Sequence, residues 1–124
     1  MTEPEDTEFN LTSLEARAKE GDIEAQYEMS ARHAIGRGVE LDDDVAVEWL
    51  QKAAASGHSL AQNNLGARYY SGDGVDKDLK QAYRCFFKAA NQGDRKAGKN
   101  LDSITRQLTV EDLEALRAEM GETN

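Results

Sequence analysis

Residues 59–94 read SLAQNNLGARYYSGDGVDKDLKQAYRCFFKAANQGD, and the same pattern begins 36 residues earlier, at position 23. Shifting the chain by 36 residues superposes glycines, alanines, acidic residues and lysines: Gly21, Gly57 and Gly93; Ala25, Ala61 and Ala97; Gly36 and Gly72; Gly38 and Gly74; Asp42 and Asp78; Lys52 and Lys88. A fixed period of this length is the signature of a repeat protein. The repeat therefore sets the interpretation of the whole chain.

Each repeat has the pattern helix, loop, helix. Ala61, Leu65 and Tyr69 fall on one face of a helix with 3.6 residues per turn. The glycine-rich run at 72–75 interrupts that helix, and Asp78 stands where the N-cap of a second helix is expected. One such pair cannot bury its apolar face alone, so neighbouring pairs must stack.

The period divides the chain into a solenoid with flanking segments. Thr12 with Glu15, and Thr109 with Asp112, fit capping boxes that begin the first and last helices. The predicted segments are a disordered acidic N-terminus (1–10), a solenoid (11–108) and a C-terminal capping helix with a tail (109–124). The solenoid consists of a half repeat (12–22), two full repeats (23–58 and 59–94) and a degenerate unit from residue 95.

The repeat resembles the Sel1-like family, a relative of tetratricopeptide repeats. The residues that carry the resemblance in the second repeat are Ala61, Leu65, Gly66, Tyr69, Gly72, Gly74, Val75, Asp78, Ala82, Phe86, Lys88, Ala89, Ala90 and Gly93. The resemblance implies an all-α, right-handed α-solenoid that acts as an adaptor between proteins. Ser30 stands in place of Gly66, His33 in place of Tyr69, and Cys85 in place of Trp49, which predicts altered core packing at these points.

Composition narrows the function further. The 124 residues carry a net charge of −9, and residues 1–62 hold 14 acidic against 5 basic side chains. So acidic a chain repels nucleic-acid phosphates and anionic membrane surfaces. The first residues lack the pattern of a secretory signal, and no apolar run is long enough to cross a membrane. We therefore expect a cytoplasmic protein that binds neither nucleic acid nor membrane.

Few residues suit catalysis or metal binding. The two histidines, His33 and His58, lie 25 residues apart; His33 occupies a core-type position and His58 follows a glycine stop, which predicts an exposed turn. Cys85 is the single cysteine, and its apolar neighbours indicate a small buried hydrophobe. Some cysteine-rich members of the resembled family are linked to β-lactam hydrolysis, but they carry a cysteine pair in each repeat. We predict a protein without enzymatic activity, cofactor or metal.

A partner is expected on the concave face, which the first helices of stacked pairs line. Removing the core positions from these helices leaves the candidate partner-binding residues Tyr27, Glu28, Ala31, Asn63, Asn64, Ala67, Tyr70, Lys99, Ser103 and Arg106, with Ala34, Ile35, Ser71 and Asn100 beside them. Small residues form the floor of this groove, and tyrosines and asparagines form its walls. The predicted ligand is a peptide or helical segment of another protein, bound by a monomer or weak homo-oligomer. A hydrolase or small-ligand binder, and a self-assembling repeat unit, remain the alternatives.

Overall fold

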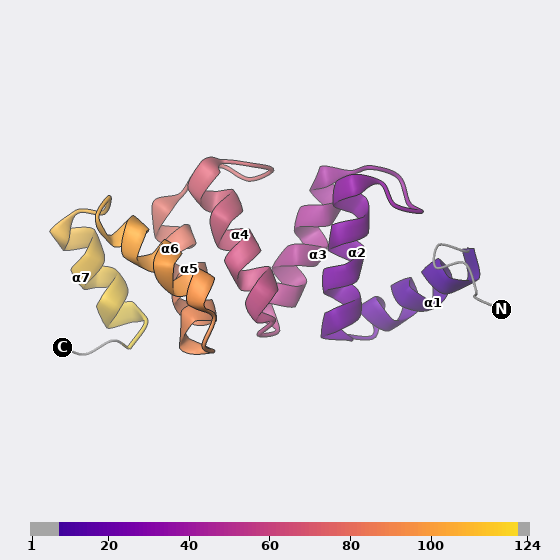
Figure 1. Cartoon of the computed structure of the whole chain (residues 1–124), viewed down its shortest axis with the longest axis horizontal. Helices are drawn as coiled ribbons and strands as arrows, with labels where there is room; N and C mark the ends of the chain where they lie inside the picture. Colours follow the sequence, from indigo (N-terminus) through magenta and orange to yellow (C-terminus); the bar gives the residue numbers. More distant parts are fainter. Residues whose placement is uncertain (1–7, 122–124) are drawn as a thin grey trace. The chain divides into compact units, whose positions relative to one another are not determined.

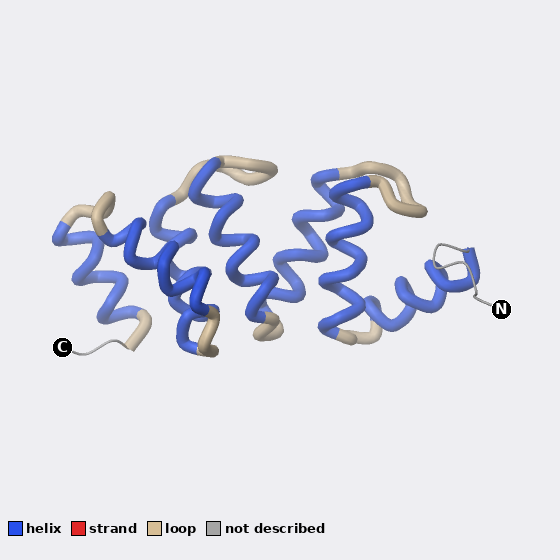
Figure 2. The backbone as a smooth tube through the Cα atoms, in the orientation of Figure 1, coloured by secondary structure: helices blue, strands red, loops and turns tan. Residues whose placement is uncertain are grey.

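The computed structural model describes residues 8–121, and every regular element in that range is an α-helix (Figures 1 and 2). The chain forms two compact units, Met1–His58 and Ser59–Asn124. The first contains α1 (Glu8–Lys19), α2 (Ile23–Ile35) and α3 (Asp43–Ala55). The second contains α4 (Ser59–Ser71), α5 (Leu79–Asn91), α6 (Arg95–Thr105) and α7 (Val110–Glu119). The helices confirm the all-α class and the helix–loop–helix repeat.

The helix ends in the first unit follow from a few polar residues and glycines. Asp22 and Asp42 are the N-caps of α2 and α3, and their carboxylates accept hydrogen bonds from the backbone N–H groups of Ala25 and Val45. Gly36 ends α2 with a φ of 72°, a left-handed conformation that glycine adopts at little cost. Short side chains and charge at the helix starts thus fix the repeat boundaries.

The core of the first unit joins all three of its helices. Leu14 and Ala18 of α1 pack with Ala25 and Met29 of α2 and with Trp49 of α3. All five side chains are buried, so the half repeat that α1 represents closes one side of the first full repeat.

Two buried polar side chains of α2 differ in how well they are satisfied. The Ser30 hydroxyl donates to the backbone carbonyl of Ala46 on α3 at 2.7 Å, across the helix crossing where the second repeat has a glycine. The Gln26 side chain donates its Nε2 to the carbonyl of Ala18 at 3.1 Å. Its Oε1 is the one buried side-chain oxygen or nitrogen without a hydrogen-bond partner among the described residues. In the second repeat the equivalent oxygen has a partner, because Gln62 Oε1 accepts a hydrogen bond from Gln92 Nε2 at 2.8 Å.

In the second unit, α4 and α5 approach each other closely at Gly66. A Cβ atom added there would lie 2.6 Å from Cε1 of Phe86 and 3.1 Å from Cβ of Cys85. The core below this crossing consists of Ala82, Tyr83, Phe86, Phe87, Ile104 and Leu116. The missing side chain at position 66 therefore gives Phe86 its place against α4.

The last helix, α7, packs on this core from the side of α5. Thr109 is its N-cap and accepts from the backbone N–H of Asp112 at 3.0 Å, which confirms the predicted cap. Arg84 on α5 forms a two-pronged ion pair with Glu119, with Nη2 2.9 Å from Oε1. Lys80 pairs with Asp112 at 3.2 Å. The helix thus covers the apolar side of α5 and α6, as expected of a capping helix.

The predicted start of the first helix is wrong. The helix α1 begins at Glu8, so Thr12 lies inside it and cannot be its N-cap. Residues 8–10 are helical although they fall in the segment expected to be disordered, whereas residues 1–7 lie outside the described part of the chain. The capping-box pattern at Thr12 does not start the helix, because the residues just before it are also compatible with a helix and extend it back to Glu8.

Candidate protein-binding surface

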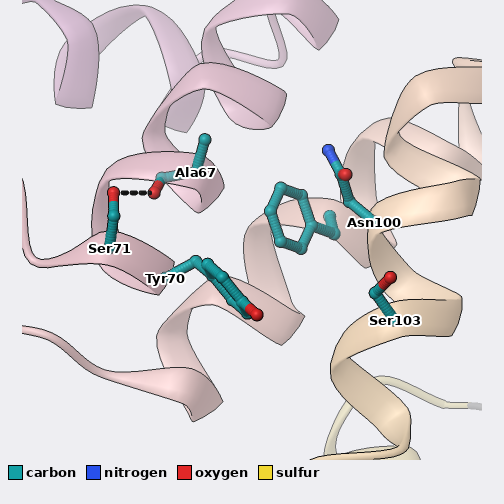
Figure 3. Close-up of a pocket in the computed structure, with 6 residues that line it drawn as sticks. Ala67, Tyr70, Ser71, Asn100 and Ser103 are labelled. Carbon is teal, nitrogen blue, oxygen red and sulfur yellow. Dashed lines mark hydrogen bonds between the residues drawn. The ribbon is translucent and has the colours of Figure 1, made fainter.

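A pocket of about 340 Å³ lies between α4 and α6 in the second unit (Figure 3). Its lining residues come from α4, from the core-facing side of α5 and from α6: Ala67, Tyr70, Ser71, Phe86, Asn100 and Ser103. The two helices are the first helices of successive repeats, and Ala67 and Ser103 occupy the same repeat position. Small side chains at this position leave the space between the helices open.

Beside the pocket, one side-chain hydrogen bond joins α4 to α6, and a second joins α4 to the turn that follows α6. Asn100 Nδ2 donates to Asn63 Oδ1 at 3.0 Å, and Gln107 Nε2 donates to the Tyr70 hydroxyl at 2.8 Å. The Tyr70 oxygen accepts in this bond, so its own proton can still be donated to a ligand. These bonds hold two wall residues in place and reduce the entropy that a ligand would otherwise have to overcome.

The predicted residues of the second unit divide into three groups. Ala67, Tyr70 and Ser103 line the pocket, whereas Asn63 is held in the bond to Asn100 beside it. The exposed side chains of Asn64, Lys99 and Arg106 do not line it.

Phe86 and Gln107 were missed by sequence reasoning. Phe86 has the spacing of a core residue and is only 2% exposed, yet part of it reaches the pocket. Gln107 lies in the turn after α6, outside the helical positions from which the candidates were drawn. The repeat alignment offered no signal for either role.

In the first unit, the predicted residue Tyr27 is half-buried because its ring stacks on His58. The ring centroids lie 4.5 Å apart at an angle of 18°, and His58 Nε2 lies 3.1 Å from Glu24 Oε1. The His58 side chain is only 7% exposed, so the prediction of an exposed turn residue is wrong. The stack pairs residues 31 positions apart, which local sequence cannot indicate.

The other predicted residues of α2 lie at its surface. Glu28 is half-buried and pairs with Arg32 at 3.1 Å, and Ala31 is exposed. This pair joins positions one turn apart and gives the helix modest support.

His33 holds the loop after α2 instead of filling the core. Its side chain is half-buried, and Nδ1 lies 3.0 Å from the carbonyl oxygen of Glu40. The carbonyl of His33 accepts from the backbone N–H of Asp42 at 3.0 Å. The matching bond in the second repeat runs from Asp78 to Tyr69 at 2.9 Å, so this loop anchor belongs to the repeat and not to the histidine.

The remaining chemistry is sparse. Burial raises the pKa of the Cys85 thiol to about 11, which keeps it protonated and unreactive near neutral pH. Within residues 8–121, no group of three or more histidine, cysteine or acidic side chains could hold a metal ion. None of the helices described combines the length and apolar character needed to cross a membrane.

Helix pairs of 36 residues, with a pocket between successive first helices, define an α-solenoid repeat protein. The Sel1 repeat model matches residues 23–58 and 59–94, the bounds predicted for the two full repeats, and the chain belongs to this family. Sel1 repeats are generally protein-interaction modules, and the proteins that contain them are typically non-enzymatic scaffolds.

Solved structures agree with this assignment. A Sel1 repeat protein from Oxalobacter formigenes is 29% identical, with a TM-score of 0.72 over 88% of this chain and 98% of that one. The c5321 protein, a protective antigen of uropathogenic Escherichia coli with an SLR fold, is 32% identical, with a TM-score of 0.74 over 90% of this chain. This chain spans 26% of that protein. The comparison with curated proteins gave no match.

Proposed function

We propose that this protein is an adaptor that binds a peptide or helical segment of a partner along α4 and α6. The observation that carries the proposal is the pocket between α4 and α6. Three of the residues that line it, Ala67, Tyr70 and Ser103, belong to the surface predicted from the repeat alone.

The chemistry of the pocket suits a protein ligand. Phe86 contributes apolar surface at its base, whereas Tyr70, Ser71, Asn100 and Ser103 supply polar groups around it. A volume of about 340 Å³ is at the small end of ligand pockets and accommodates a side chain of a bound segment. The polar groups can hydrogen-bond the backbone on either side of that side chain.

The hydrolase alternative finds little support in the chain. A nucleophilic cysteine needs a lowered pKa and an adjacent base, whereas burial raises the pKa of Cys85. Its nearby charges, Lys88 and Arg84, lower the pKa by less than burial raises it. An adaptor without covalent chemistry is therefore the better interpretation.

A filled pocket tests the proposal. Ala67 is exposed on α4, so Ala67→Gln extends a longer side chain across the pocket without disturbing the core. Ala115→Gln is the matched control, because Ala115 is exposed on α7 and does not line the pocket. Preys captured by wild type from a lysate of the source organism are identified by mass spectrometry, and the affinity of each purified prey is then measured by calorimetry.

We expect at least a tenfold loss of affinity for Ala67→Gln and none for Ala115→Gln, with equal helicity by circular dichroism. Preys that bind both variants as tightly as wild type would contradict the pocket assignment. Hydrolysis of a β-lactam by wild type would favour the enzyme alternative, and a concentration-dependent mass in solution would favour self-assembly.

A further inference from the structure

The helix that forms one wall of the pocket is strongly basic. The helix α6 with its two caps carries two carboxylates, Asp94 and Asp102, and four cations: Arg95, Lys96, Lys99 and Arg106. The opposite wall, α4, contains no acidic residue at all. The pocket therefore lies in a locally positive part of an acidic protein.

Helical spacing places the cations along the α6 wall, before and after the residues of α6 that line the pocket. Ser103 lines it, and Lys99 and Arg106 lie four residues before and three residues after Ser103, one turn away in each direction. Lys96 has the same relation to Asn100, another lining residue. The cations thus border the pocket on the α6 side.

These cations have no carboxylate partners among residues 8–121. No ion pair joins Lys96, Lys99 or Arg106 to another described residue, although Lys80 and Arg84 in the same unit both pair with α7. Lys96 and Lys99, which are three residues apart on one helix, repel each other, and an anionic ligand would relieve that repulsion.

We propose that the segment bound here is an acidic peptide with one apolar side chain in the pocket and carboxylates on either side of it. Lys99 and Arg106 are separated by about 10 Å along the helix axis, at 1.5 Å per residue. An extended peptide covers that distance in three residues, at about 3.3 Å each. The fitting ligand therefore carries two acidic residues three positions apart with a Leu, Met or aromatic residue between them.

This inference rests on the proposed function and specifies its ligand. A nucleic-acid strand is the competing polyanion, but the net charge of −9 repels a long phosphate chain, and the pocket offers apolar surface from Phe86. A short peptide with two carboxylates matches the local charge and the apolar base together.

Selection from a random dodecapeptide display library tests the inference. Three forms serve as targets: wild type, the double variant Lys99→Gln/Arg106→Gln, and the control Lys77→Gln/Lys88→Gln. The control removes the same charge at exposed positions outside the pocket. The affinities of the enriched peptides for these three forms and for the Ala67→Gln variant are measured by fluorescence anisotropy at low and high salt. A 20-nucleotide single-stranded RNA is tested as a competing ligand in the same assay.

We expect wild type to enrich peptides with the acidic spacing described above. The Lys99→Gln/Arg106→Gln variant should bind them about three- to tenfold more weakly and the control variant equally well, because each exposed charge pair contributes modestly. The difference should shrink in 0.5 M salt.

Two results would overturn the inference in distinguishable ways. Enriched peptides that depend on Ala67 but are uncharged and insensitive to Lys99→Gln/Arg106→Gln would refute the acidic ligand and leave the proposed function intact. A library that yields no peptide sensitive to Ala67→Gln would refute both. RNA that binds more tightly than the peptides and displaces them would replace the peptide by a nucleic acid.

Discussion

The substitution Gly66→Ala measures how tightly α4 and α5 are packed. The new Cβ would lie 2.6 Å and 2.7 Å from two ring carbons of Phe86 and 3.1 Å from Cβ of Cys85. Phe86 is 2% exposed and packs in the core, so any shift of its ring disturbs the contacts that it makes there. Such overpacking costs about 1–3 kcal/mol.

Helix propensity acts in the opposite direction. Replacing a glycine inside a helix by alanine stabilises it by about 0.5–1 kcal/mol, because the unfolded chain loses conformational freedom. The net expectation for Gly66→Ala is a loss of about 1–2 kcal/mol. The control is Gly98→Ala in α6, where an added Cβ meets nothing within 4 Å, so that variant should gain about 0.5–1 kcal/mol.

Urea unfolding followed by circular dichroism compares the two variants with wild type. Opposite shifts of the unfolding midpoint would support the reasoning. If Gly66→Ala is as stable as wild type or more stable, α5 can retreat at low cost, and the close approach at position 66 does not constrain the repeat.

Three further predictions concern other parts of the chain. Ser56→Gln should stabilise the first unit by about 0.5–1.5 kcal/mol in urea titrations. Residue 56 has the backbone conformation of Gln92, so a glutamine there could donate to the unpaired Gln26 Oε1, as Gln92 donates to Gln62. An unchanged unfolding midpoint would contradict this prediction. Alkylation of Cys85 at pH 8 should be on the order of a hundredfold slower in folded than in urea-unfolded protein, since burial raises its pKa to about 11, and equal rates would refute the burial argument. The hydrogen bond from Arg84 lowers the pKa of Glu119. The ion pair should therefore stabilise α7 fully above the ordinary glutamate pKa of about 4.3, and this stabilisation should be lost as the pH falls through the lower pKa of the folded state. Amide exchange in α7 should therefore be faster in Glu119→Gln than in wild type at pH 6, and the difference should vanish in acid; the same difference at all pH values would exclude a role for the charge.

The repeat bounds could be predicted from sequence because they depend on local chemistry. Caps such as Asp42 and Asp78 and turn glycines such as Gly36 act within a few residues, and the period places each of them twice. Three of the six residues that line the pocket, Ala67, Tyr70 and Ser103, could be predicted in the same way, since exposed positions on the first helices recur with the period. The fold class and the polar face of α4 were thus predictable.

The missed features depend on contacts between distant residues. The stack of Tyr27 on His58 joins the first half of α2 to the turn that follows the next helix, α3. A core residue such as Phe86 can also present one edge to a pocket, which periodicity cannot distinguish from complete burial. The predicted N-cap at Thr12 was wrong for the opposite reason, because the local capping signal was outweighed by residues that extend the helix back to Glu8.

The equivalence of Ala67 and Ser103 has a consequence for how such proteins diversify. Each repeat contributes one wall of the pocket, so a duplicated 36-residue segment would bring a new wall in register with an old one. Substitutions at exposed positions of a single first helix could then alter ligand preference while the alanines and Gly66 that set helix spacing stay fixed. New specificity could be acquired by recombining repeats, with little risk to the packing that keeps the chain folded.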